Sequence, residues 1–224
     1  PILWHVMKIY AAAGITDFVI CLGYKGDQIK EWFVRYRLKV SDVTVDLASG
    51  EVTYHSGPAE PWRVTLVETG DDTQTGGRLR RAAHHLDPHE PFLLTYGDGV
   101  GDIDVAASLA FHRQHGRLAT VTAVSPPGRF GALQREGDRV VRFAEKPASG
   151  GTINGGFFLM SPRVIDLIAG DETLLEREPL ERLARDGELM AFEHRGFWQP
   201  MDTVRDRKVL EDLWATGHAP WKVW

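Results

Sequence analysis

The chain has 224 residues, which is long enough to bury a substantial core as one large domain or as a domain with an appendage. Apolar residues make up 43% of it and charged residues 25%, a balance that is typical of a folded protein and argues against disorder. The formal net charge of -5 argues against a surface that binds nucleic acid or an anionic membrane, and no stretch is apolar for long enough to span a bilayer.

Cys21 is the only cysteine, and it lies inside the apolar run DFVICLG. No internal disulfide is possible, so a reducing compartment is the simpler expectation. No signal peptide opens the chain either, and we therefore expect a cytoplasmic protein.

The first half of the chain alternates helix and strand patterns. Residues 1–14 predict a helix that begins at a proline and ends at a glycine, and the apolar run at 17–23 predicts a buried strand. The further predicted helices cover 25–38, 75–86 and 105–116. The further predicted strands cover 42–57, as two short strands around a Ser-Gly turn, 63–69, 91–98 and 118–124. This alternation predicts a Rossmann-like α/β core, in which helices cover both faces of a mostly parallel sheet.

The second half adds antiparallel patterns to this core. Residues 131–147 predict a hairpin that turns at Gly137 and Asp138, and residues 153–160 predict a further strand. Two helical stretches, an extended run and a last helix follow, at about 162–169, 173–185, 188–202 and 203–214. No low-complexity linker separates the halves, so we expect a single domain over residues 1–224.

The start of the chain departs from the βαβ pattern. A strand should precede the first helix, yet that helix already begins at Pro1. Either the architecture begins unusually or the sequence as written lacks its N-terminal strand, and we expect the second.

Asp98 ends the predicted strand at 91–98 and lies between Gly97 and Gly99. In open α/β sheets, ligands bind beyond the carboxyl ends of the strands, and glycines let a ligand approach the backbone. A carboxylate there suits Mg²⁺, which takes one or two carboxylates and fills its other positions with water and phosphate oxygens. A turn at the end of a strand explains the same residues equally well, because Asp and Gly are common in turns.

Asp102 and Asp104 form a D-x-D pair a few positions later. Such a pair is typical of many metal-dependent glycosyltransferases, which makes sugar transfer to an acceptor an alternative function. Both residues also stand just before the predicted helix at 105–116, where Asp commonly caps a helix. We expect these two residues to shape the turn and begin the helix, and Asp98 to be the metal ligand.

A second polar stretch, FAEKPASGGTINGGFF, covers residues 143–158. Glu145 and Lys146 are adjacent in an extended segment before a proline, so their side chains point in different directions. A carboxylate that accepts from sugar hydroxyls, beside an ammonium that neutralises phosphate, suits a sugar phosphate, although an isolated pair of this kind is more often a solvated surface pair. The nearby NGG at 154–156 favours a binding site, since glycine weakens a strand and often marks the close approach of a ligand.

Two further stretches complete the candidates. TGGRL, at 75–79, opens a helix with two glycines, where free backbone N–H groups and Arg78 would meet a phosphate or a base edge. A loop and a helix cap are the alternative explanation of TGGRL. Asp202 is a second candidate carboxylate, and Asp98 and Asp202 together would hold one Mg²⁺. Spacing alone does not show that the two aspartates meet.

These motifs, in this order, resemble those of the glucose-1-phosphate cytidylyltransferases, a branch of the sugar nucleotidyltransferase family. The resemblance spans essentially the whole chain and rests on TGGRL, TYGDGV, PPGRFGAL, EKP, INGGFF and GELMAFEHRGFWQPMDT. Each motif alone is weak, but the combination is specific. The forms INGGFF and FWQPMDT look more like the cytidylyl enzymes than their thymidylyl or uridylyl relatives.

The resemblance implies a transfer of CMP from CTP to α-D-glucose 1-phosphate, which gives CDP-glucose and pyrophosphate for the O-antigen sugars of bacterial surfaces. The sugar phosphate oxygen would attack the α-phosphorus in line, so positioning and charge neutralisation would supply most of the catalysis. The resemblance also implies a homo-oligomer, with a hexamer as one candidate.

The resemblance gives each candidate residue a role. The Mg²⁺ ligands would be Asp98 and Asp202, which count as catalytic together with Lys146. The residues around CTP would be Thr73, Gly76, Gly77, Arg78 and Gly97. The residues around the sugar phosphate would be Gly131, Glu145, Lys146, Asn154 and Gly155.

One part of the family pattern is expected before Pro1 and is not in the sequence. This is the glycine-rich loop after the first strand, which would clamp the triphosphate. We therefore expect the chain as written to be nearly inactive, and the protein with this loop to be active. The absent loop also leaves a non-catalytic subunit that binds sugar nucleotides as a further alternative function.

Overall fold

The computed structural model describes residues 1–55, 57, 59–125, 132–136, 139–144 and 152–224, and for 132–136 and 139–144 it describes the backbone alone. The chain forms two compact units. Unit 1 contains Pro1–Gly14, Pro88–Val164 and Leu180–Trp224, and unit 2 contains Ile15–Asp87 and Ile165–Pro179. The expectation of a single domain stays a prediction.

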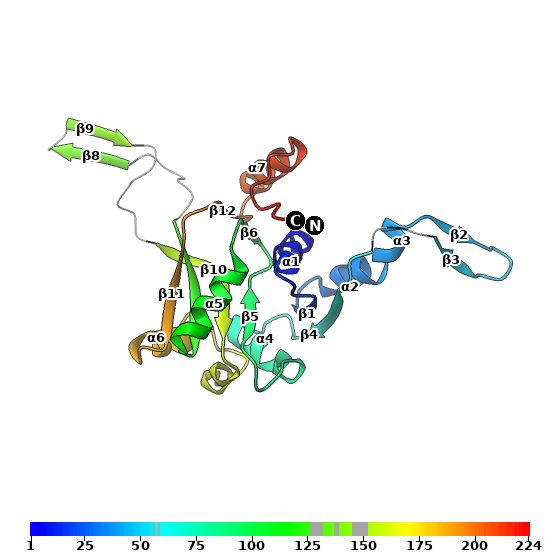
Figure 1. Ribbon diagram of the computed structural model, residues 1–224, viewed down its shortest axis with the longest axis horizontal. Helices are drawn as coiled ribbons and strands as arrows, with labels where there is room; N and C mark the ends of the chain where they lie inside the picture. The colour runs from blue at the N-terminus through cyan, green and yellow to red at the C-terminus, as the bar shows by residue number, and fades with distance from the viewer. Residues whose placement is uncertain (56, 58, 126–131, 137–138, 145–151) are drawn as a thin grey trace. The chain divides into compact units, whose positions relative to one another are not determined.

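A four-stranded sheet forms the centre of unit 1 (Figure 1). Its order is β11 (Leu189–His194), β7 (Ala119–Val124), β10 (Ile153–Met160) and β5 (Phe92–Thr95). β11 is parallel to β7, and β10 is antiparallel to both β7 and β5, so β5, β7 and β11 all run in the same direction. The predicted α/β class is confirmed, and β10 is the expected antiparallel member of the sheet.

The α-helices of unit 1 bury apolar side chains in its core. They are α1 (Ile2–Ala12), α5 (Val105–His115), most of α6 (Glu178–Arg185) and α7 (Val204–Ala215), and the 3-10 helix η2 (Pro162–Leu167) begins in the same unit. As the sequence predicts, α1 follows Pro1 and ends before Gly14. The φ of Gly14 is +85°, a left-handed conformation that glycine adopts readily. Tyr10 of α1 stacks on Phe157 of β10 with ring centroids 5.7 Å apart, and both residues are buried. Burial of such aromatic side chains supplies much of the stabilisation of the core.

Two short strand pairs extend unit 1. β6 (Gly99–Gly101) pairs antiparallel with β12 (Trp198–Pro200), and we call this pair the β6–β12 ribbon. The expected hairpin in the second half is also present, as β8 (Ala132–Glu136) and β9 (Arg139–Ala144). Its predicted turn, at Gly137 and Asp138, lies outside the described residues. The sequence did not predict β6, because GVG has the composition of a turn and no alternation of apolar and polar side chains.

Unit 2 has a parallel strand pair at its centre, β1 (Asp17–Leu22) with β4 (Arg63–Glu68). Its helices are α2 (Gly26–Val34), α3 (Tyr36–Val40) and α4 (Thr75–Ala82), followed by the 3-10 helix η1 (Ala83–His85). The predicted hairpin is confirmed as β2 (Val43–Val45) and β3 (Val52–Tyr54). Its turn includes Gly50, with a φ of +76°, and Asp46, whose carboxylate accepts the N–H of Ala48 at 2.8 Å.

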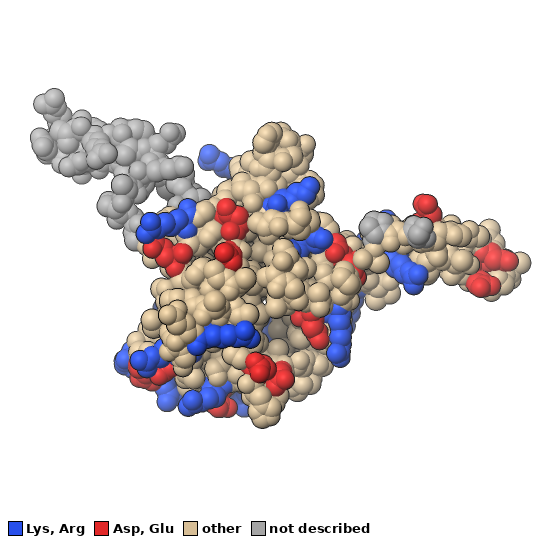
Figure 2. All heavy atoms as spheres, viewed as in Figure 1, with Lys and Arg blue, Asp and Glu red and all other residues tan. Residues whose placement is uncertain are grey.

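On the face drawn in Figure 2, acidic and basic side chains are interspersed rather than gathered in a large field of one sign. Within the described ranges, no helix has both the length and the apolar character that crossing a bilayer requires.

Candidate functional site

Asp98 and Asp202 come together at one end of the β6–β12 ribbon in unit 1. The register pairs Gly99 with Pro200, and at the next position the N–H of Met201 donates to the carbonyl oxygen of Asp98 at 2.8 Å. Asp202 directly follows Met201 in the chain. The antiparallel pairing therefore places two aspartates that are far apart in the sequence beside each other.

The two carboxylates repel each other electrostatically. Partial burial raises the pKa of Asp98, and the negative charge of Asp202 raises it further. Both residues stay exposed as a whole, so a cation from solvent can reach them. A divalent cation between the carboxylates would remove the repulsion, and the donor set of this pair therefore fits a hard cation.

A larger cluster of metal ligands is not needed for such a cation. In the described part of the chain, no three side chains of His, Cys, Asp or Glu gather around one point. Mg²⁺ is usually held by one or two carboxylates and completes its octahedron with water and phosphate oxygens.

The residue after Asp202 is fixed by a capping box at the start of α7. Thr203 Oγ1 accepts the N–H of Asp206 at 3.2 Å, and Asp206 Oδ2 accepts the N–H of Thr203 at 3.0 Å. Gln199 Nε2 donates to the other oxygen of the Asp206 carboxylate at 3.1 Å. Asp206 is only 8% exposed, so this network is held inside the unit and restricts the backbone on both sides of Asp202.

Gly97, next to Asp98, lies in open space. It is exposed, and a Cβ at this position would meet only Leu3, at 4.0 Å. The backbone beside Asp98 is therefore accessible to a bulky ligand, although its contact with a nucleotide stays a prediction.

Asn154 and Gly155 lie in unit 1, where β10 shifts its register against β7. Asn154 is exposed, and its Oδ1 accepts the N–H of Gly156 at 2.8 Å, which leaves its amide N–H groups for other partners. A Cβ at Gly155 would lie 2.7 Å from Val124 Cγ1, so close packing explains this glycine. The Gly155 carbonyl accepts from Trp198 Nε1 at 2.8 Å, which connects the predicted sugar side to the β6–β12 ribbon.

Gly76 and Gly77 lie in unit 2, in the first turn of α4. Their N–H groups donate to the carbonyl of Thr173 at 2.9 Å and 3.3 Å, so the expectation of free N–H groups here is wrong. A Cβ would lie 2.7 Å from the Thr173 carbonyl at Gly76 and 2.5 Å from the Asp171 carbonyl at Gly77. Close packing of the 171–175 segment against α4 therefore requires both glycines.

Arg78 ties together the ends of the two central strands of unit 2. Its Nη1 donates to the Leu22 carbonyl at 3.0 Å and to Thr69 Oγ1 at 2.8 Å, and its Nη2 donates to the Asp71 carbonyl at 3.1 Å. These bonds hold the loop that carries Thr73, which is 8% exposed. A guanidinium has five N–H donors, so contact with a base or phosphate stays a prediction alongside this role.

The remaining candidates are Gly131, Glu145 and Lys146, and they lie outside the described residues. Their roles stay predictions. The predicted metal and sugar residues that are described lie in unit 1 together with Gly97, and the other predicted nucleotide residues lie in unit 2.

The D-x-D pair has separate roles in the structure. Asp104 is the N-cap of α5, and its Oδ1 accepts the N–H of Ala107 at 2.8 Å, which confirms the expected cap. Asp102 follows β6 and lies 3.1 Å from His194 Nε2. No motif in the sequence singles out His194, since the nine histidines are scattered without a spacing signal, and none singles out Trp198.

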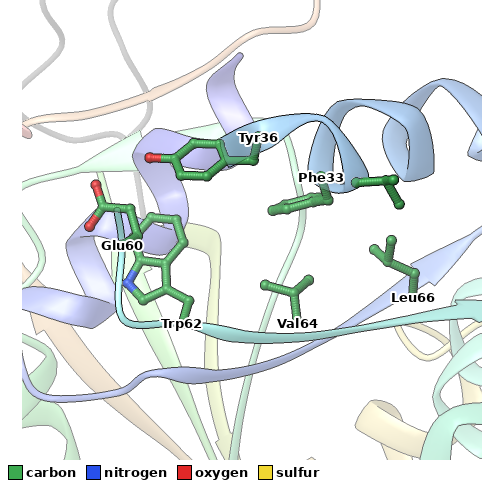
Figure 3. Close-up of a pocket in the computed structure, with 7 residues that line it drawn as sticks. Phe33, Tyr36, Glu60, Trp62, Val64 and Leu66 are labelled. Atoms are coloured by element: carbon green, nitrogen blue, oxygen red, sulfur yellow. The ribbon is translucent and has the colours of Figure 1, made fainter. Parts of the chain in front are cut away.

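The pocket in Figure 3 has a volume of about 270 Å³ and lies in unit 2, between α2–α3 and β4. Its lining is Phe33, Val34, Tyr36, Glu60, Trp62, Val64 and Leu66. The lining is apolar apart from the tyrosine hydroxyl, the indole N–H and the Glu60 carboxylate, which would repel a nucleotide. None of the predicted site residues lines it, so the candidate site is at the aspartate pair and not in this pocket.

Similarity to known proteins extends over the whole chain. The family model described as Nucleotidyl transferase matches residues 1–203. The glucose-1-phosphate cytidylyltransferase of Salmonella typhi is 57% identical over 225 residues, which cover 100% of this chain and 88% of that protein. The protein of the same name from Salmonella typhimurium (strain LT2) matches with the same identity and coverage.

Solved structures share the fold at lower identity. The structure of HddC from Yersinia pseudotuberculosis complexed with GMP-PN is 20% identical in sequence and has a TM-score of 0.67. The match covers 95% of this chain and 85% of that chain. A UDP-glucose pyrophosphorylase complexed with UDP-glucose is 13% identical, with a TM-score of 0.66 over 97% of this chain and 87% of that chain. Because the family model and the Salmonella relatives match along nearly the whole sequence, this chain belongs to the nucleotidyl transferase family.

Proposed function

We propose that this protein transfers CMP from CTP to α-D-glucose 1-phosphate, giving CDP-glucose and pyrophosphate. The observation that carries this proposal is the 57% identity over the full chain to proteins named glucose-1-phosphate cytidylyltransferase. The exposed pair of Asp98 and Asp202 supports the proposal, because these two carboxylates fit a cation. Such a cation would neutralise the negative charge that two reacting phosphates bring to one point. The proposed use of CDP-glucose is the synthesis of O-antigen sugars.

In the proposed reaction, an oxygen of the sugar phosphate attacks the α-phosphorus of CTP. A new P–O bond forms there as the bond to the β-phosphate breaks, and pyrophosphate leaves with the bonding electron pair. Enzymes of this family generally use a divalent metal, and we propose Mg²⁺, which when bound would neutralise charge on the α-phosphate and on the incoming sugar phosphate.

The side chains of this protein would bind and orient the two substrates. Asp98 and Asp202 would hold the cation, and Gly97 would leave room for the nucleotide beside Asp98. Lys146 would neutralise the sugar phosphate, and Glu145 would accept from sugar hydroxyls. Such positioning accounts for most of the acceleration in phosphoryl-type transfers, and no covalent intermediate on the protein is required.

The other proposed contacts divide between the two substrates. The CTP side would contain Thr73, Gly76, Gly77 and Arg78. The sugar side would contain Gly131, Asn154 and Gly155. For Gly76 and Gly77 we propose an indirect role, in which close packing of α4 holds the Thr73 loop in place.

We also propose a cytoplasmic enzyme that forms a homo-oligomer. A single cysteine and a nucleoside triphosphate substrate favour the cytoplasm. Light scattering on the purified protein would test the assembly, for which a hexamer is the candidate.

The test is pyrophosphate release by the protein at its natural length, with Mg²⁺, CTP and glucose 1-phosphate. UTP and dTTP, each supplied in place of CTP and then as competitors, measure the base selectivity. We expect release with CTP and much weaker release with the other two. Transfer of glucose from CDP-glucose to an acceptor would instead support a glycosyltransferase, and tight CDP-glucose binding without turnover would support a non-catalytic subunit.

A further inference from the structure

The two strands of the β6–β12 ribbon do little by themselves to fix their register. Each has three residues, and an isolated two-stranded pair is marginally stable in water. Gly99 and Gly101 have no side chains to pack, and Pro200 has no N–H to donate. Register is weakly specified in glycine-rich strands, and a slip of one residue moves a strand by about 3.3 Å. The positions of Asp98 and Asp202 therefore depend on contacts outside the ribbon.

The other end of the ribbon is joined to the four-stranded sheet by Asp102 and His194. The N–H of Asp102 donates to the Phe197 carbonyl at 3.2 Å, and Asp102 Oδ1 lies 3.1 Å from His194 Nε2. His194 Nε2 is also 3.1 Å from the Phe197 carbonyl. Carboxylate and carbonyl oxygens only accept, so Nε2 carries the hydrogen. His194 ends β11 and pairs with Val124 of β7, so this contact fixes the ribbon to the sheet.

Burial makes the contact between Asp102 and His194 sensitive to substitution. The His194 side chain is 9% exposed and the Asp102 side chain 36%. Asp102 Oδ1 is buried and accepts no hydrogen bond from any residue that the structure describes, because the imidazole N–H is aligned with the Phe197 carbonyl instead. The attraction to the imidazole is therefore electrostatic, and removal of the ring would leave a buried carboxylate oxygen with nothing to offset its desolvation.

Gly196 leaves space for this arrangement. A Cβ at that position would collide with the Asp102 carboxylate and would lie 2.7 Å from His194 Cε1. The turn between β11 and β12 is thus built around the pair, rather than the pair lying on the surface of an independent turn.

We propose that Asp102 and His194 are positioning residues, which hold the β6–β12 ribbon in register and thereby fix the separation of the Asp98 and Asp202 carboxylates. The inference rests on the metal role proposed for those two aspartates. Neither positioning residue binds the cation itself. Side chains that hydrogen-bond directly to metal ligands change metal affinity about 10–100-fold when they are removed. Asp102 and His194 act one step further away, through the ribbon, so we expect an effect at the lower end of that range.

Binding of Mn²⁺, measured by electron paramagnetic resonance on the protein at its natural length, tests the pair without turnover. We expect Asp102→Ala and His194→Ala each to weaken Mn²⁺ binding about 10-fold. The double variant should also lose about 10-fold, because both substitutions remove the same contact and their effects should not add.

Asp104→Asn is the matched control for the loss of charge. It removes a neighbouring carboxylate and keeps a good N-cap for α5, so Mn²⁺ binding should be unchanged. Asp102→Asn keeps an acceptor oxygen, and His194→Gln keeps an N–H donor. Both variants should therefore lose less Mn²⁺ affinity than the alanine variants. These two variants keep the test decisive where an alanine variant fails to fold.

Two results would overturn the inference. Loss of Mn²⁺ binding in Asp102→Ala, with no effect in His194→Ala, would make Asp102 a metal ligand. A lower melting temperature with unchanged Mn²⁺ affinity in both variants would make the pair merely structural. Absence of CMP transfer by the unchanged protein, with the Mn²⁺ results as expected, would contradict the proposed function and support the positioning pair.

Discussion

Gly77→Ala separates two explanations of the TGG sequence at the start of α4, namely close packing of the chain and room for a phosphate. A Cβ at Gly77 would lie 2.5 Å from the carbonyl oxygen of Asp171 and 2.6 Å from its Cα. These are backbone atoms, which cannot rotate away as a side chain can. The 171–175 segment must therefore move, which breaks the bonds from the Gln74 N–H to the Asp171 carbonyl and from the Gly76 N–H to the Thr173 carbonyl.

The expected cost follows from these contacts. Alanine is favoured over glycine in a helix by about 1 kcal/mol. Overpacking costs about 1–3 kcal/mol, and two broken hydrogen bonds cost about 1 kcal/mol each. Gly77→Ala should therefore lower the free energy of unfolding by about 2–4 kcal/mol, as measured by urea denaturation.

Gly170→Ala is the matched control, since a Cβ there would meet only Arg80 Nη1, at 3.9 Å. Its unfolding free energy should stay within about 0.5 kcal/mol of that of the unchanged protein. A Gly77→Ala variant that is as stable as the unchanged protein, yet has lost CTP binding, would refute the packing argument and favour direct contact with phosphate.

Two further predictions concern unit 1. Trp198→Phe keeps an aromatic ring but removes the N–H that donates to the Gly155 carbonyl at 2.8 Å. It should cost about 1–3 kcal/mol of stability and raise the Michaelis constant for glucose 1-phosphate, and an equal rise for CTP would contradict a role on the sugar side. Burial lowers the pKa of His5 from 6.5 to about 4, and Trp221 Nε1 donates to its Nδ1 at 3.3 Å, which requires an unprotonated nitrogen. The unfolded chain therefore binds this proton below pH 6.5, and the folded protein binds it only near pH 4. As the pH falls from 6.5 to 4, the free energy of unfolding should decrease by about 1–2 kcal/mol, after allowance for partial exposure. His5→Gln should flatten this part of the dependence of stability on pH, as measured by urea denaturation.

Local patterns predicted most of the secondary structure. The helix at α1 has a proline before it and a glycine after it, and the strand at β1 is a continuous apolar run, so both are encoded within a few neighbouring residues. β6 was not predicted, because the prediction depended on such local patterns. Gly99 and Gly101 carry no side-chain pattern, and the strand exists because β12 pairs with it from a distant part of the chain.

The candidate site was predicted residue by residue, but not its arrangement. Asp98 and Asp202 were identified as carboxylates that suit a cation, and only the antiparallel register shows that they are neighbours. Gly76 was expected to offer a free N–H group. In the structure this N–H donates to the carbonyl of Thr173, which is far away in the sequence. His194 and Trp198 act through contacts with residues far away in the sequence, and no local motif reports such contacts.

The central claim is that the carboxylates of Asp98 and Asp202 support transfer of CMP from CTP to a sugar phosphate. The most direct measurement follows the label of [α-³²P]CTP in the unchanged protein and in the Asp98→Asn, Asp202→Asn and Asp104→Asn variants. We predict that the label enters CDP-glucose in the unchanged protein and in Asp104→Asn, and that Asp98→Asn and Asp202→Asn each lower the rate at least about 100-fold. Undiminished labelling of CDP-glucose in Asp98→Asn or Asp202→Asn, or labelling lost equally in Asp104→Asn, would contradict the claim.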